Sequence, residues 1–93
     1  MEMNKIIKIK RFNSTISIKI RNILDVEKSL GYITLTYWTP DDGRKKTLYI
    51  FDDEPITWYD KEDVESTDYE KLVDTLSVYA EQTKLKDALA SLN

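Results

Sequence analysis

Cysteine and histidine are both absent from this 93-residue chain. Without cysteine there is no disulfide, no thiolate metal site and no cysteine nucleophile. Without histidine the chain also lacks the commonest general base and the commonest transition-metal ligand. Any catalysis would have to use carboxylates, lysine or tyrosine, so we expect a protein that is not an enzyme and that holds no metal and no cofactor.

Glycine is scarce, with Gly31 and Gly43 the only two. Two separated glycines cannot build the phosphate-binding loops of P-loop or dinucleotide-binding proteins. No apolar run approaches the ~18 residues that a membrane span requires. Residues 1–5 also lack the apolar stretch of a signal peptide. We therefore expect a cytoplasmic protein with no membrane association and no small-molecule substrate.

The chain is 41% apolar and 33% charged, which is typical of a globular protein. We expect a single domain over residues 1–93. Its charges are sorted by position. Residues 1–51 carry ten basic and five acidic residues, a net charge of +5, whereas residues 52–93 carry four basic and twelve acidic residues, a net charge of −8. One half would attract anions and the other cations, so charge is the best physical indication of a partner.

Alternating isoleucines over residues 15–21 predict a strand with one buried and one exposed face. Residues 5–12 predict a strand before it, and Asn13-Ser14 suits a two-residue hairpin turn. The register that follows from this turn pairs Phe12 with Thr15, Ile9 with Ile18, Ile7 with Ile20, and Lys8 with Lys19.

Three further strands are predicted over residues 23–27, 32–39 and 45–51. A four-residue turn over 28–31 would join the first two, with a short helix over 25–30 as the alternative. Pro40-Asp41-Asp42-Gly43 has the composition of a tight turn. The expected pairs are Val26 with Ile33, Leu24 with Leu35, Thr39 with Arg44, Leu35 with Leu48, Ile33 with Ile50, Thr34 with Tyr49, and Tyr32 with Phe51.

Residues 52–66 are interpreted as an acidic linker, in which residues 56–59 either add a short edge strand or fold back over the sheet. A capping box from Thr67 to Glu70 would then open a helix over residues 67–92. Its apolar stripe consists of Tyr69, Leu72, Val73, Leu76, Tyr79 and Ala80. The apolar residues beyond it, Leu85, Ala88, Leu89 and Leu92, lie about 160° further around the helix. This jump predicts a bend or break near residues 82–84.

The expected fold class is α+β, an antiparallel β-meander of four to five strands over residues 4–51, packed on one face by the C-terminal helix. The helix stripe around Leu72, Val73 and Leu76 would cover the apolar face of the sheet. That face consists of Ile7, Ile9, Ile16, Ile18, Ile20, Val26, Ile33, Leu35, Leu48 and Ile50.

The opposite face of the second hairpin carries Tyr32, Trp38, Tyr49 and Phe51. Such a row of rings is not expected to stay in water. It would be covered by the segment around Trp58, by a second copy of the chain, or by a partner, because tyrosine and tryptophan are frequent anchors of interfaces. Stacked bases are a further option.

The polar face of the first hairpin carries four basic residues: Lys8, Lys10, Lys19 and Arg21. They indicate a phosphate-binding surface for RNA or DNA. Lysines on an exposed strand face are also ordinary solvation and protect against aggregation. In a third interpretation the acidic segment folds against them and neutralises them within the molecule.

Ten acidic residues fall within residues 52–74, against Lys61 and Lys71 only. They are typical of a solvated linker and helix start. They also suit an acidic surface that imitates nucleic acid and occupies a basic groove on a target protein. The candidate contact residues are Asp52, Asp53, Glu54, Asp60, Glu62 and Asp63.

Residues 22–37, a strand, a Gly31-Tyr32 turn and a second strand, resemble the meander of LytTR-type DNA-binding domains and of small flagellar FlbD-like proteins. The similarity is one of hydrophobic pattern and carries no site residue. We predict a small non-enzymatic protein-interaction module, a phage or mobile-element regulator or inhibitor. It would bind a protein partner or a second copy through the aromatic face and the acidic segment. The alternative is a nucleic-acid-binding module that uses the basic face.

Overall fold

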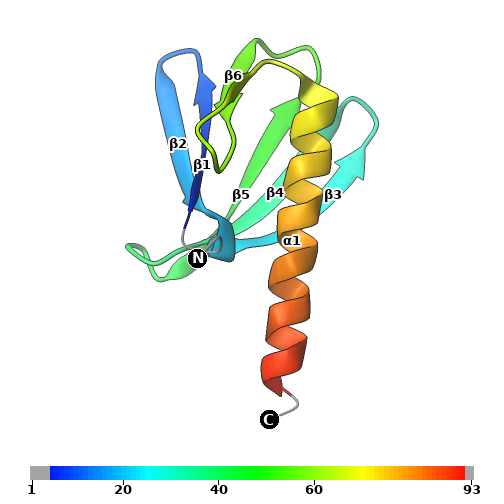
Figure 1. The fold of residues 1–93 in the computed structure, drawn as a ribbon. Helices are drawn as coiled ribbons and strands as arrows, with labels where there is room; N and C mark the ends of the chain where they lie inside the picture. Colours follow the sequence, from blue (N-terminus) through cyan, green and yellow to red (C-terminus); the bar gives the residue numbers. More distant parts are fainter. Residues whose placement is uncertain (1–4, 92–93) are drawn as a thin grey trace.

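The computed structural model describes residues 5–91 as an α+β fold with antiparallel strand pairing throughout (Figure 1), which confirms the predicted fold class. In chain order the elements are β1 (Ile6–Arg11), β2 (Ser14–Lys19), the 3-10 turn η2 (Ile20–Asn22), β3 (Ile23–Ser29), β4 (Tyr32–Thr39), β5 (Arg44–Phe51), β6 (Ile56–Tyr59), β7 (Glu65–Ser66) and α1 (Tyr69–Ser91). The strands form two sheets, ordered β2-β1-β6-β7 and β3-β4-β5.

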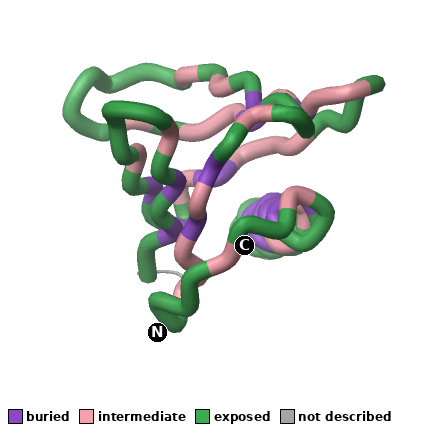
Figure 2. The backbone as a smooth tube through the Cα atoms, turned by 90° about the horizontal axis from the view of Figure 1, so that it is seen from above, coloured by how far each residue is buried: buried purple, intermediate pink, exposed green. Residues whose placement is uncertain are grey.

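The division into two sheets occurs at η2, where the chain leaves the first sheet and enters the second. The amide of Ile20 donates to the carbonyl of Lys5 at 2.9 Å, which anchors this turn beneath β1. Seen from above, the two sheets and the helix surround the buried residues (Figure 2). Most of the predicted apolar face lies in this single cluster, and Ile16, Val26 and Leu48 pack against it while partly buried. The helix residues Leu72, Val73 and Leu76 belong to the same cluster, as predicted.

The β1–β2 hairpin is shifted by two residues from the predicted register. Ile9 pairs with Ile16, and Lys8 pairs with Ser17 rather than with Lys19. The turn is made by Phe12-Asn13, because Phe12 adopts a φ of +33°, a conformation that few non-glycine residues take. A shift of two residues keeps every side chain on its predicted face.

The β3–β4 hairpin is also shifted by two residues, and its turn is shorter than predicted, with two residues instead of four. Its turn is Leu30-Gly31, with Gly31 at φ +85°, so Val26 pairs with Leu35 instead of Ile33. A β-bulge at Leu24 then shifts the pairing by one residue, so that Ile23 pairs with Tyr37. The alternative helix over residues 25–30 is wrong, since this stretch belongs to β3 and its turn. The β4–β5 register is confirmed at all five predicted pairs, from Thr39–Arg44 to Tyr32–Phe51.

The predicted acidic linker contains two strands. β6 pairs with β1, with Trp58 opposite Ile9, and β7 pairs with β6 on its other side. β6 is therefore an internal strand and not the edge strand expected from its neighbouring proline and carboxylates. Its alternation of buried Ile56 and Trp58 with less buried neighbours supplies part of the core.

The N-cap of α1 lies one residue later than Thr67, the N-cap that the capping box predicted. Asp68 is the N-cap: its Oδ1 accepts from the amide of Lys71 at 3.1 Å. The helix then runs to Ser91 without the break predicted near residues 82–84. Thr83, whose hydroxyl donates to the Tyr79 carbonyl at 3.1 Å, is the last buried residue between Tyr69 and Ala90. No helix within residues 5–91 has both the length and the apolar composition needed to cross a membrane.

Candidate functional site

The outer face of the β3-β4-β5 sheet carries four aromatic side chains, which we call the outer aromatic face: Tyr32, Trp38, Tyr49 and Phe51. Tyr32 and Phe51 are cross-strand partners and so share a face. Their neighbours Ile33 and Ile50 point the other way and are fully buried. The rings therefore stand on the side of the sheet away from the core.

Three of these rings form one cluster at the end of the sheet nearest β6. The Tyr32 ring centre lies 5.6 Å from that of Phe51 and 6.2 Å from that of Tyr49, both in tilted arrangements. Such contacts hold the rings in place and add stability beyond area burial. Trp38 lies six residues along β4, at the opposite end of the same strand.

The outer aromatic face is open in the described part of the chain. Tyr49 is 52% exposed, Phe51 46% and Trp38 38%. The segment around Trp58 does not cover it, because β6 belongs to the other sheet. Trp58 itself is 1% exposed and its indole N–H donates to the Asp68 carbonyl at 3.1 Å. The prediction of Trp58 as a surface anchor is therefore wrong, and its ring is part of the core.

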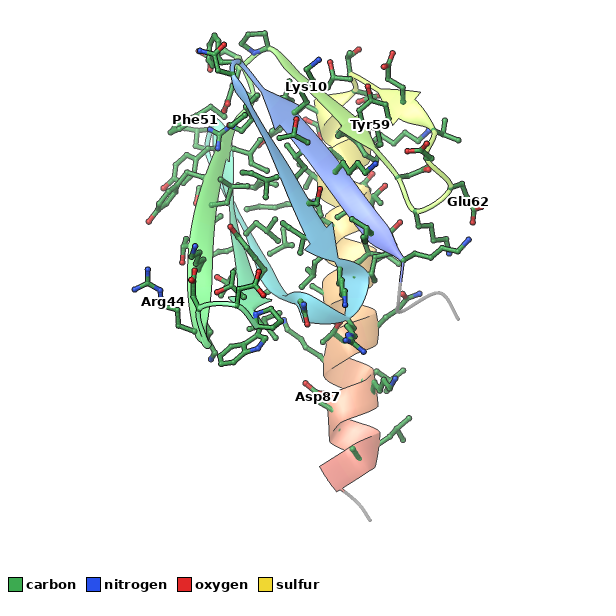
Figure 3. The ribbon with its side chains drawn as sticks, turned by 90° about the vertical axis from the view of Figure 1, so that its left-hand side faces the viewer. Lys10, Arg44, Phe51, Tyr59, Glu62 and Asp87 are labelled. Carbon is green, nitrogen blue, oxygen red and sulfur yellow. The ribbon has the colours of Figure 1, made fainter. Side chains whose placement is uncertain are left out.

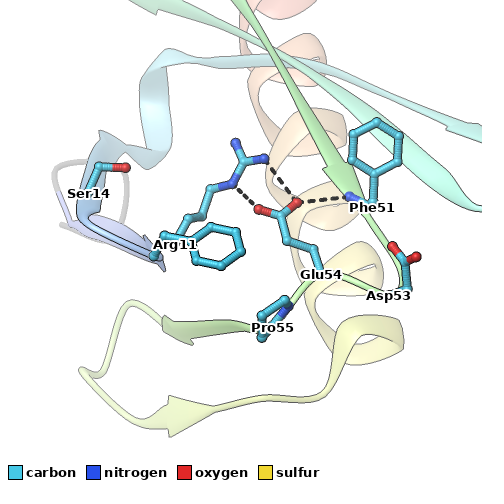
Figure 4. A pocket seen from close by; sticks show the side chains of 7 residues that line it. Arg11, Ser14, Phe51, Asp53, Glu54 and Pro55 are labelled. Atoms are coloured by element: carbon cyan, nitrogen blue, oxygen red, sulfur yellow. Dashed lines mark hydrogen bonds and ion pairs between the residues drawn. The ribbon is translucent and has the colours of Figure 1, made fainter.

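An ion pair borders the aromatic cluster at the open edge of β5 (Figure 4). The Arg11 guanidinium binds the Glu54 carboxylate in a two-pronged contact, with Nη2 to Oε1 at 2.9 Å and Nε to Oε2 as the second bond. Nη2 also donates to the Tyr49 carbonyl at 3.1 Å, and the Phe51 amide donates to Glu54 Oε1 at 3.3 Å. Two polar groups of an edge strand are thus satisfied by side chains from elsewhere in the chain.

A groove of about 550 Å³ opens over this ion pair, lined by Arg11, Phe12, Ser14, Phe51, Asp53, Glu54 and Pro55. Phe12 is 78% exposed at the tip of the β1–β2 turn, and Phe51 contributes the other ring. The groove extends the outer aromatic face toward the first sheet. Sequence reasoning missed Phe12 at this position, because its positive φ, and hence the turn, is not predictable from residue preferences.

The acidic segment does not form one surface. Glu54 is held by Arg11 and its side chain is only 9% exposed. Asp60 shapes the β6–β7 turn, since its Oδ1 accepts from the amides of Glu62 and Val64 at 2.9 and 3.0 Å. Glu54 and Asp60 were predicted as partner contacts, but they have structural roles instead.

The remaining candidate acids lie in two separate places. Asp52 and Asp53 follow Phe51 in the β5–β6 connection, whereas Glu62 and Asp63 lie in the β6–β7 turn. Figure 3 places Phe51 and Glu62 on opposite sides of the molecule. Asp53 lines the groove beside Phe51, whereas Asp52 lines a hollow with Tyr69 and Val73 on the helix side. Of these four acids, only Asp53 therefore borders the outer aromatic face.

Three of the four predicted basic residues lie together on the outer face of the first sheet. Lys8 and Lys10 alternate along β1 and Lys19 ends β2, all exposed. Arg21 lies in η2 instead, outside this strand face, because the strand ends at Lys19. The acidic segment meets this face at Lys5, whose Nζ reaches Glu62 Oε1 at 3.5 Å, and at Lys10, which lines a hollow together with Glu65.

The hydroxyl of Tyr59, beside the lysines, has a raised pKa. Tyr59, which lies across from Lys8, donates its hydroxyl to Glu65 Oε1 at 2.8 Å. This hydrogen bond, together with burial and the nearby carboxylates, raises the pKa of Tyr59 above its ordinary value of 10.0. The Tyr59 hydroxyl therefore stays protonated at neutral pH and orders the β6–β7 pair.

No group of three or more acidic side chains within residues 5–91 is arranged to hold a metal ion. The most distinctive surface of the described chain is therefore the outer aromatic face with its adjoining groove. Comparison with protein-family models, with curated proteins and with solved structures finds no match to this chain.

Proposed function

We infer that the chain is a non-enzymatic protein-interaction module that binds a protein partner through the outer aromatic face. The observation that carries this proposal is the exposure of Tyr49 and Phe51, 52% and 46%, on a rigid sheet. Neither the segment 56–59 nor α1 lies on them. Clustered, exposed tyrosine and phenylalanine side chains are characteristic of interface anchors.

The surroundings of the rings indicate the chemistry of the partner surface. Thr34, Thr36 and Thr47 separate the rings along the sheet and offer hydroxyls for hydrogen bonds. Asp53 borders the Phe51 end, and Lys45 faces outward beside Trp38. The best-matched partner presents an apolar patch with a basic group at one end and an acidic group at the other.

In this proposal the mechanism is occlusion. A flat aromatic face has no groups for catalysis, but it can cover a patch on a target and block other contacts there. A regulator or inhibitor of the kind encoded by phages and mobile elements would act in this way, in the cytoplasm. The acids Asp52 and Asp53 would steer basic targets toward the face at low salt.

Affinity capture from a lysate with three matched baits tests this proposal. We expect Tyr49→Ser to lose the specific partner, because it removes an exposed ring without touching the core. Leu30→Ser is the control, since Leu30 is 99% exposed in the β3–β4 turn. Equal capture by wild type and Tyr49→Ser would refute the proposal.

A nucleic-acid-binding role is the second candidate. It is favoured by Lys8, Lys10 and Lys19, which share one exposed face and form no ion pair with a described residue. Titration of labelled single-stranded RNA and duplex DNA at two salt concentrations tests it. Binding that weakens steeply with salt and that is lost in Lys8→Ser/Lys10→Ser would place the function on this face instead.

A further inference from the structure

The last part of α1 extends beyond the two sheets (Figure 1). Thr83 is the last buried residue up to Ala90, and Lys84 Nζ lies 2.8 Å from Asp25 Oδ1 of β3. From Leu85 to Ala90 every residue of the helix is exposed. A helical segment this short is marginal in water unless its exposed face packs against another surface.

The exposed face of this helix is apolar in a regular pattern. Val78 is 52% exposed, Leu85 62% and Leu89 55%. Together with Gln82 these residues are spaced 4, 3 and 4 apart, which is the a/d spacing of a coiled coil. In the sequence the pattern continues at Leu92, which lies outside the described residues. It ends in the other direction at Thr75 and Lys71, which are polar.

This seam faces away from the core. At 100° per residue, the seam lies roughly 150–160° around the helix from Leu72, Val73, Leu76 and Thr83, which face the sheets. A shallow hollow bounded by Ser77, Val78, Glu81, Gln82 and Leu85 follows the same side. A second helix laid along the seam therefore does not meet the body of the molecule.

The charges beside the seam select the partner. With Gln82 and Leu89 at a positions and Val78 and Leu85 at d positions, Glu81 occupies a g position and Lys86 an e position. In a parallel pair of identical helices, g faces the e residue five positions later in the other helix, so Glu81 meets Lys86 twice by symmetry. In an antiparallel pair g faces g and e faces e, so Glu81 and Lys86 would not pair with each other.

We propose that the protein forms a parallel, two-fold symmetric dimer through the seam Val78, Gln82, Leu85 and Leu89 of α1, with Glu81 of each copy paired to Lys86 of the other. Gln82 lies at the axis opposite its own copy and sets the register, as single polar a residues do. The seam covers only about two heptads, so the interface is small and the dimer is weak. It does not involve the outer aromatic face and leaves both copies of that face open.

Sedimentation equilibrium of the full chain from micromolar to millimolar concentration tests the dimer. We expect a reversible monomer–dimer equilibrium that Leu85→Glu abolishes. Leu30→Glu, which adds the same charge at a 99% exposed leucine outside the helix, keeps the dimer. Tyr49→Ser also keeps it, which separates this proposal from self-association through the aromatic face.

Charge reversal tests the parallel arrangement. Glu81→Lys and Lys86→Glu each weaken the dimer about threefold to tenfold, and the double reversal restores it, because each pair is rebuilt with the signs exchanged. A chain that stays monomeric at ~1 mM, or a dimer that survives Leu85→Glu, overturns the proposal. A dimer that is lost in Leu85→Glu but not restored by the double reversal overturns its parallel geometry.

Discussion

Removal of the Glu54 carboxylate gives the sharpest test of how the two sheets are held together. Glu54→Ala deletes the partner of the Arg11 guanidinium and the acceptor of the Phe51 amide. Both partners are partly buried, with side chains 22% and 9% exposed, so solvent screens the pair only in part. Arg11 keeps its bond to the Tyr49 carbonyl at 3.1 Å.

The expected cost follows from these contacts. Hydrogen bonds to charged groups contribute about 1.5–3 kcal/mol each, and the loss of one partner of a buried pair costs about 3–5 kcal/mol. Because Arg11 remains 22% exposed and retains one acceptor, we expect Glu54→Ala to lower the free energy of unfolding by about 2–3 kcal/mol. In a domain of this size that lowers Tm by about 8–24 °C.

Equilibrium urea unfolding, followed by tryptophan fluorescence, measures this difference. Asp53→Ala is the matched control, because Asp53 is the adjacent exposed acid in the same connection and should change stability by less than about 0.5 kcal/mol. A cycle with Arg11→Met should give a coupling free energy of at least about 1 kcal/mol. If Glu54→Ala is as stable as Asp53→Ala, Glu54 is free for a partner and the structural role assigned to it is wrong.

Two further predictions concern the N-cap of α1 and the hydrogen bond between β6 and β7. Asp68→Ala should lower the free energy of unfolding in urea by about 1 kcal/mol, because Asp68 caps α1. Thr67→Ala is the control and should leave it almost unchanged. A larger loss in Thr67→Ala than in Asp68→Ala would instead support the predicted capping box with Thr67 as the N-cap. Glu65→Gln should lower the pKa of Tyr59 toward its ordinary value of 10.0 in an ultraviolet titration, because it weakens the hydrogen bond that raises it. The pKa of Tyr59 is higher in the folded chain than in the unfolded chain. The stability that the Tyr59 hydroxyl contributes is therefore fully present below the unfolded-state pKa and is lost as the pH rises through the folded-state pKa. If Tyr59 titrates in Glu65→Gln as it does in the wild type, the role assigned to this hydrogen bond is wrong.

Side-chain alternation predicted the core well, because the face on which a residue lies does not depend on the exact register. Ile7, Ile9 and Ile18 are buried although the β1–β2 hairpin is two residues out of its predicted register. The β4–β5 register was predictable because Pro40 and Gly43 define the turn chemically. The β1–β2 register was not, because it depends on a positive φ at Phe12.

The candidate site was predictable only in part. The outer aromatic face follows from the alternation of Tyr32 and Trp38 with Ile33, and its rings lie where the pattern put them. The position of Trp58 could not be predicted from its alternation with neighbouring residues. The same alternation is expected whether residues 56–59 lie across the outer aromatic face or pair with β1 and bury Trp58 in the core. The acidic segment misled for a related reason: Glu54 and Asp60 have partners that lie 43 residues away or in their own turn, and composition does not contain that information.

Hydroxyl-radical footprinting of the chain with and without its captured protein partner tests the central claim most directly. The claim predicts that Tyr49 and Phe51 lose most of their oxidation in the complex, while Leu30 and Val64, exposed by 99% and 53% elsewhere on the surface, are oxidised as before. Unchanged oxidation of Tyr49 and Phe51 in a complex that forms would contradict it.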